Sequence, residues 1–256
     1  MARVHRQLLR SMRVFMGRAF MKWGVGMSLM EKVALLQISA KVEGDYLEFG
    51  VFQGASFIES YHALHNAHRL MIRGLGVSTT PEDAKEWQEI WERSRFFAFD
   101  SFEGLPELEG IDQDTKDFAK GKFAAGIEEF RGNIAGQGVP LDRVTCIPGW
   151  FDQTCVPATI EAHGLRKASV IWIDCDLYHS TKSVLDFVVP LLQDGTILIF
   201  DDWYCFRGNP QRGEQRAFAE WRGTLPGYTF SEYQKEGPFR NSFVVSEVLE
   251  GRRDGE

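Results

Sequence analysis

The fold is decided by the stretch Tyr46-Leu47-Glu48-Phe49-Gly50-Val51-Phe52-Gln53-Gly54. Residues 44–49 are mostly apolar and have the length of a strand, and residues 55–68 have a helical pattern. Two glycines, Gly50 and Gly54, bound the turn between them. A strand, a glycine-rich turn and a helix in this order are typical of an α/β fold with a parallel sheet.

The same alternation continues along the chain. We predict helices at 29–42, 55–68, 81–93, 127–135, 180–192 and 213–222, and strands at 44–49, 96–99, 144–147, 169–173, 196–200, 228–233 and 242–248. The first five strands are nearly all apolar, as expected for strands covered on both faces. The sequence therefore predicts a three-layer α/β/α Rossmann-like fold with a mostly parallel sheet and a C-terminal antiparallel hairpin. Residues 112–121 are polar and predict a surface segment.

Composition narrows the class of protein. The chain has 256 residues, of which 44% are hydrophobic and 25% charged, as in ordinary globular domains. No apolar stretch is long enough to span a membrane, and a net charge of −7 argues against nucleic-acid binding. Four cysteines at no metal-finger spacing favour a reducing, cytoplasmic setting.

The first 30 residues differ from the rest because they carry six basic side chains and no acidic one. Their apolar residues recur at helical spacing, which predicts an amphipathic helix. Such a helix could lie on a membrane surface or gate a substrate, but packing on its own domain or on a second subunit is the favoured interpretation. We expect an N-terminal helical segment at 1–42, a catalytic domain at 43–250, a polar tail at 251–256, and a homodimer or higher homo-oligomer.

Acidic residues and glycines follow the predicted strands, where α/β folds bind ligands. Gly50 and Gly54 allow the backbone to approach a ligand, and the helix after Gly54 offers free N–H groups. Asp100, at the end of the second strand, could accept hydrogen bonds from ribose hydroxyls. Because a complete dinucleotide motif is absent, and Glu48 and Asp100 would repel phosphate, S-adenosylmethionine fits better than NAD. Trp150 and Phe151 could flank its adenine or could be core residues.

Four aspartates form the strongest local signal: Asp174 and Asp176 follow the fourth strand, and Asp201 and Asp202 follow the fifth. If these strands are neighbours, the carboxylates meet at one edge, where crowding raises pKa values or requires a cation. Oxygen ligands without nearby histidine or cysteine favour a hard ion, Mg²⁺ first and Mn²⁺ or Ca²⁺ as alternatives. The competing interpretation is that the two pairs cap adjacent helices.

Taken together, these motifs resemble the macrocin O-methyltransferase (TylF-type) family of class I S-adenosylmethionine-dependent enzymes, which methylate sugar hydroxyls. The resemblance runs from about Leu29 to the C-terminus and rests on five stretches: 46–54, 100–106, 149–154, 174–181 and 201–203. It implies Mg²⁺ held by Asp174, Asp201 and Asp202, and Asp176 as general base. The residues expected at the cofactor are Glu48, Gly50, Gly54, Asp100, Ser101, Gly149, Trp150 and Phe151.

The resulting hypothesis is an enzyme that transfers a methyl group to a hydroxyl of a sugar or glycosylated small molecule. One rival is a metal-dependent methyltransferase acting on a vicinal phenol, and a less favoured rival is a noncatalytic nucleoside-binding protein. Residues 203–212 and 69–94 are longer than expected for the antibiotic-sugar enzymes. The acceptor is therefore left open.

Overall fold

The computed structural model describes residues 26–74, 80–113, 115 and 118–248, and these form two compact units. The first unit comprises the described residues up to Val42 together with Glu59–Ser94, and the second comprises Glu43–Ile58 and the described residues from Arg95 onward. The basic segment at 1–25 and the tail at 251–256 lie outside the described residues. The candidate site lies entirely in the second unit.

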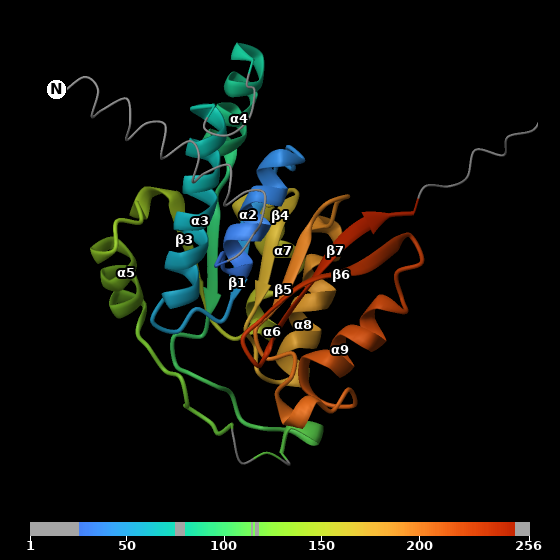
Figure 1. The fold of residues 1–256 in the computed structure, drawn as a ribbon. Helices are drawn as coiled ribbons and strands as arrows, with labels where there is room; N and C mark the ends of the chain where they lie inside the picture. The colour runs from blue at the N-terminus through green and yellow to red at the C-terminus, as the bar shows by residue number, and fades with distance from the viewer. Residues whose placement is uncertain (1–25, 75–79, 114, 116–117, 249–256) are drawn as a thin grey trace, which may run out of the picture. The chain divides into compact units, whose positions relative to one another are not determined.

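The second unit is built on one seven-stranded sheet in the order β3-β2-β1-β4-β5-β7-β6. The first five strands are parallel, and β7 pairs antiparallel with both β5 and β6 (Figure 1). The strands are β1 (Asp45–Phe49), β2 (Phe96–Asp100), β3 (Val144–Pro148), β4 (Ala168–Ile173), β5 (Ile197–Phe200), β6 (Tyr228–Glu236) and β7 (Arg240–Glu247). This arrangement confirms the predicted parallel sheet and C-terminal hairpin.

Helices of the second unit connect these strands. They are α5 (Ile127–Gly136), α6 (Phe151–Thr154), α7 (Pro157–His163), α8 (Tyr178–Val188) and α9 (Gly213–Arg222). Short 3-10 turns are η1 (Gly110–Asp112), η2 (Leu141–Arg143), η3 (Val189–Leu191) and η4 (Phe206–Gly208). Helices α6 and α7 were not predicted, and α8 begins two residues before the predicted position.

Alternation along the strands divides the sheet residues between two faces. Leu47 and Phe49 join a buried cluster with residues of α8 and α9, including Val184 and Phe218. Tyr46, from the opposite face, has its ring against Phe57 and Phe96. Both faces of the central strands are buried, which explains why their sequences are almost continuously apolar.

The first unit contains α2 (Leu29–Ser39), α4 (Pro81–Arg93) and most of α3 (Ala55–Ile72), whose first residues belong to the second unit. Thr80 caps α4 with Asp83 in a capping box, at the start of the helix predicted at 81–93. Lys41 is paired with Asp83 and Glu86. Within the described residues, no helix combines the length and apolar character needed to cross a membrane.

Candidate active site

A cavity of about 930 Å³ lies at the carboxyl ends of the parallel strands in the second unit. Its size is within the range of small-molecule sites. Ten of the twelve residues predicted for the site line it: Gly50, Asp100, Ser101, Gly149, Trp150, Phe151, Asp174, Asp176, Asp201 and Asp202. Glu48 and Gly54 are not among the lining residues.

Glu48 lies at 0% exposure inside the second unit. The hydroxyl groups of Tyr46 and Ser56 each donate a hydrogen bond to one of its carboxyl oxygens. Burial raises the pKa of Glu48 to about 8, although both hydrogen bonds act in the opposite direction. The side chain is therefore held by its own strand and by the first turn of α3.

Asp100 organises the turn after β1. Its Oδ2 accepts hydrogen bonds from the backbone N–H groups of Val51 at 2.7 Å and Phe52 at 3.1 Å. Its Oδ1 accepts a third from Phe102 N at 2.7 Å. The carboxylate thus joins the turns after β1 and β2, and it also lines the cavity.

Two glycines allow close packing around this turn. Gly50 has φ +86°, and a Cβ placed there would lie 1.9 Å from the carbonyl oxygen of Asp174. Gly54 has φ +90°, and its Cβ would lie 2.9 Å from Ile134 Cγ2 in α5. Both positions therefore require glycine, because a side chain would prevent the turn from packing against the end of β4 and against α5.

The turn after β3 presents aromatic side chains to the cavity. Trp150 immediately precedes α6 and is half-buried. Phe151 is also half-buried, and its ring packs edge-on against Phe49 at 6.0 Å between centroids. Both aromatic residues line the cavity, and Phe151 is in addition part of the packing over the sheet.

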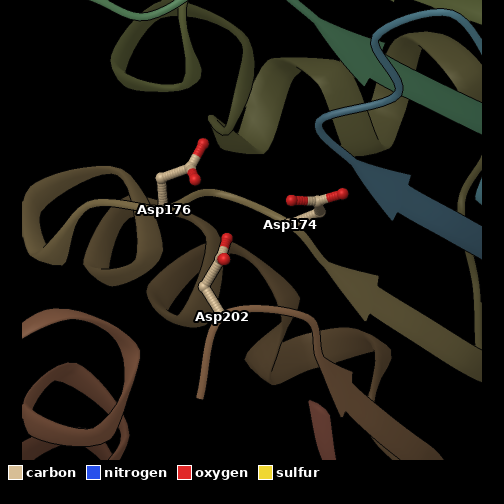
Figure 2. A group of neighbouring side chains, drawn as sticks. All are labelled: Asp174, Asp176 and Asp202. Carbon is tan, nitrogen blue, oxygen red and sulfur yellow. The ribbon is translucent and has the colours of Figure 1, made fainter. Parts of the chain in front are cut away.

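Three carboxylates converge on the other side of the cavity. Asp174, Asp176 and Asp202 each offer an oxygen, and these oxygens lie within 4.8 Å of one another (Figure 2). Asp174 and Asp176 follow β4, and Asp202 follows β5, which pairs with β4. The sequence predicted that the two acidic pairs meet at one edge of the sheet. The structure brings three of these four side chains together.

This cluster suits a hard cation. Burial is the main cause that raises the pKa of Asp174 and of Asp176, and the negative charges of neighbouring carboxylates raise both further. Asp202 Oδ2 is buried and has no hydrogen-bond partner among the described residues. An oxygen-only donor set with uncompensated charge fits Mg²⁺ or a similar divalent ion.

Asp201 is placed differently from its neighbour. The Nε of Arg240 donates to Asp201 Oδ1 at 2.6 Å, while Nη1 of the same arginine donates to Glu236 at 3.0 Å. Burial raises the pKa of Asp201, and Arg240 opposes that shift. Its role as a metal ligand stays a prediction.

Two residues that the sequence analysis did not identify also contact Asp202. Glu214, 1% exposed, accepts a hydrogen bond from Asp202 N at 3.0 Å through Oε2, and its Oε1 has no partner among the described residues. Cys205 Sγ donates to Asp202 Oδ1 at 3.0 Å. Glu214 lies in the first turn of α9, where an acidic residue ordinarily indicates only a favourable helix end.

The polar segment at 112–121 agrees only in part with its prediction. Gln113 and residues 119–121 are exposed, as expected for a surface segment, but Asp112 and Phe118 are buried, at 2% and 7% exposure. Asp112 accepts hydrogen bonds from the start of α8, and Phe118 packs against Phe206. Local composition did not reveal these two buried positions, because Asp112 has its partner 66 residues away along the chain.

Comparison with known proteins gives one family match and several relatives. The family described as Macrocin-O-methyltransferase (TylF) matches residues 85–222. An 8-demethyl-8-(2,3-dimethoxy-alpha-L-rhamnosyl)-tetracenomycin-C 4'-O-methyltransferase from Streptomyces olivaceus is 31% identical over 168 residues, which cover 63% of this chain and 54% of that protein. A demethyldecarbamoylnovobiocin O-methyltransferase from Streptomyces niveus is 28% identical over 171 residues, covering 65% and 55%. The chain thus spans about half the length of the curated relatives it matches.

Solved structures agree on the fold. The O-methyltransferase NovP superposes with a TM-score of 0.63 at 21% identity, covering 85% of this chain and 78% of that one. The calicheamicin methyltransferase CalS11 gives 0.60 at 22% identity, covering 84% and 76%. These similarities confirm the predicted class I methyltransferase architecture.

Proposed function

Because the chain belongs to the macrocin-O-methyltransferase (TylF) family, we propose that it is an S-adenosylmethionine-dependent O-methyltransferase that uses a divalent cation, Mg²⁺ first, and acts on a hydroxyl of a sugar or glycoside. The observation that carries the proposal is the shared cavity. One wall is formed by the glycine turn and Asp100, and the facing acids are Asp174, Asp176 and Asp202.

The cofactor is assigned to the side of the cavity formed by the ends of β1, β2 and β3. Gly50, Asp100, Ser101, Gly149, Trp150 and Phe151 line that side. An acidic, glycine-bounded turn suits the ammonium and hydroxyl groups of S-adenosylmethionine better than it suits phosphate. When bound, the cofactor supplies an electrophilic methyl group. Glu48 and Gly54, which do not line the cavity, would act by holding the turn in shape.

The cation is assigned to the side formed by β4 and β5. Asp174 and Asp202 belong both to the predicted ligand set and to the observed cluster. Asp201 is the third predicted ligand, and to serve it would share its carboxylate with Arg240. A bound divalent cation would lower the pKa of a coordinated acceptor hydroxyl.

Asp176 is proposed as the general base. It lies 8% exposed within the cluster, and burial followed by the charge of Asp202 raises its pKa, which increases its affinity for a proton. Asp176 would take the proton of the acceptor hydroxyl as the methyl group passes from the cofactor sulfur to that oxygen.

The acceptor class is inferred from the relatives. The names of the tetracenomycin, novobiocin and mycinamicin enzymes describe O-methylation of natural products, and one names a rhamnosyl group. The calicheamicin methyltransferase CalS11 is itself named a TDP-rhamnose 3'-O-methyltransferase. A deoxysugar hydroxyl is therefore the first acceptor to test. The cytoplasmic location and homo-oligomeric state expected from the sequence stay predictions.

A methylation screen by mass spectrometry tests this function. The full chain would be incubated with S-adenosylmethionine, MgCl₂ and, separately, dTDP-L-rhamnose, 4-nitrophenyl α-L-rhamnoside or catechol. We expect a monomethylated rhamnose product that is lost with excess EDTA. Methylation of catechol alone would favour the phenol alternative, and no binding of S-adenosylmethionine in calorimetry would refute the enzyme assignment.

A further inference from the structure

Asp112 and His179 form a buried-acid and imidazole pair on the cavity wall. Asp112 ends η1, and its Oδ1 accepts a hydrogen bond from Tyr178 N at 3.0 Å. Its Oδ2 accepts two more, from His179 N at 3.2 Å and from His179 Nδ1 at 2.8 Å. The same carboxylate therefore holds both the start of α8 and the imidazole ring.

This contact determines which ring nitrogen is free. An ionised carboxylate can only accept, so His179 Nδ1 must carry a hydrogen. The His179 side chain is 55% exposed and lines the cavity, and its Nε2 has no partner among the described residues. In the neutral ring Nε2 is then a hydrogen-bond acceptor that is available to a ligand.

A second contact restricts the position of the ring. Gly110, also in η1, has φ +52°, and a Cβ placed there would lie 3.2 Å from His179 Cε1. The ring thus lies directly against backbone that carries no side chain. Asp112 and Gly110 together fix the position of the His179 ring and therefore of its Nε2 atom. Capping of α8 alone would need only the backbone hydrogen bonds to Asp112.

The position of His179 in the sheet topology indicates which ligand it meets. The strand order reverses between β1 and β4, so the turns after β1, β2 and β3 lie on one side of that point and the β4 and β5 ends on the other. His179 lies in the first turn of α8, three residues after Asp176. It therefore belongs to the acceptor side rather than the cofactor side.

We propose that His179 Nε2 accepts a hydrogen bond from a second hydroxyl group of the methyl acceptor, and that Asp112 is the positioning residue that fixes this ring. The inference rests on the proposed function and deepens it, because it assigns recognition of a polyhydroxylated acceptor to a residue outside the acidic cluster. In this proposal His179 binds a second hydroxyl group of the acceptor, and Asp176 takes the proton of the hydroxyl group that is methylated.

The first test is spectroscopic and needs no acceptor. Long-range ¹H–¹⁵N correlation spectra of the full chain report which nitrogen of His179 is protonated. We expect hydrogen on Nδ1 in the wild type at pH 8, and a shift toward hydrogen on Nε2 in Asp112→Asn, because the amide places a donor beside the ring. Hydrogen on Nε2 in the wild type, or no change in Asp112→Asn, would overturn the assignment.

The second test separates binding from chemistry. With 4-nitrophenyl α-L-rhamnoside as acceptor, His179→Phe keeps a ring but has no acceptor nitrogen, so it should raise KM roughly tenfold, the effect of one lost hydrogen bond, and change kcat much less. Calorimetric affinity for S-adenosylmethionine should stay at the wild-type value. His163→Phe, at a histidine that ends α7 and does not line the cavity, is the matched control.

The outcomes distinguish this inference from the function on which it rests. An unchanged KM in His179→Phe, or weakened binding of S-adenosylmethionine, would overturn the role of His179 while leaving the methyltransferase assignment intact. Absence of methylation of every acceptor by the wild type, with no cofactor binding, would refute the proposed function and with it this role. In that case the tautomer of His179 would still report the action of Asp112.

Discussion

The acids on the two sides of the cavity have different surroundings. On the β1 and β2 side, Glu48 accepts hydrogen bonds from two hydroxyl groups and Asp100 accepts three from backbone N–H groups. On the β4 and β5 side, one carboxylate oxygen each of Asp174, Asp176 and Asp202 lies within 4.8 Å of the other two, and Asp202 Oδ2 has no partner among the described residues. An acid that follows a strand can therefore build a turn or stay available for a ligand, depending on the donors around it.

The difference extends to charge. Neighbouring acids raise the pKa of Asp174 and Asp176, after burial, which is the larger cause. Arg240 pairs with Asp201 at this edge, and the charge of Lys122 lowers the pKa of Asp176. A cation would offset the repulsion among the other three carboxylates. The comparison predicts that substitutions on this side affect chemistry and metal binding, and that those on the other side affect stability.

The largest expected effect is on turnover. Asp176→Asn keeps the size of the side chain but removes a proton acceptor, so kcat should fall by ~10² to 10⁴-fold. Calorimetric affinity for S-adenosylmethionine should stay close to that of the wild type. Asp142→Asn, at an exposed aspartate in η2, serves as the matched control. Near-normal turnover of Asp176→Asn would remove this residue from the base role.

A pair of adjacent aspartates tests the cation site next. Asp202→Asn should weaken Mn²⁺ binding roughly 100-fold, whereas Asp201→Asn should weaken it roughly 10-fold, because Arg240 already engages Asp201. Titration of Mn²⁺ followed by electron paramagnetic resonance measures both without any acceptor. A larger loss in Asp201→Asn than in Asp202→Asn would reverse the ranking that the cluster suggests.

Asp100 should behave in the opposite way. Asp100→Asn places an amide donor where one carboxylate oxygen accepted a hydrogen bond, and so leaves at least one backbone N–H of the turn without its partner. We expect a loss of about 1–3 kcal/mol of unfolding free energy. Mn²⁺ affinity should be unchanged. Urea denaturation beside Asp142→Asn checks the loss, and an unaltered midpoint would show that Asp100 does not hold the turn.

Much of this fold could be predicted because the central strands are short, continuously apolar and followed by glycine or acidic residues. Those features are local, as in the segment from Tyr46 to Gly54. Helices α6 and α7 were missed because four and seven residues are too few to show a periodic pattern. The aspartates of the site were found because each lies at the end of a strand or within three residues after it.

The partners of those acids could not be predicted, since they come from distant parts of the chain. Arg240 lies 39 residues beyond Asp201, and the tie between Asp112 and His179 spans 67 residues. Tyr46 reaches Glu48 because alternate residues share one face of β1, but nothing in the sequence shows that Glu48 does not line the cavity. Whether an acid is satisfied depends on tertiary packing, which decides its role.

The most gradual effect concerns Glu48, because it is spread over several pH units. Its pKa in the folded chain is raised to about 8 from an ordinary value of 4.5, so between these limits the folded chain holds a proton that the unfolded chain has lost. Stability should therefore fall as pH rises from 5 to 8, by at most about 1.4 kcal/mol per pH unit from this group. Glu48→Gln cannot ionise and should flatten that slope while the Tyr46 and Ser56 hydroxyls reorient around the amide. Urea midpoints at pH 5, 6, 7 and 8 for both proteins measure the difference, and parallel pH profiles would show that Glu48 is ionised when folded.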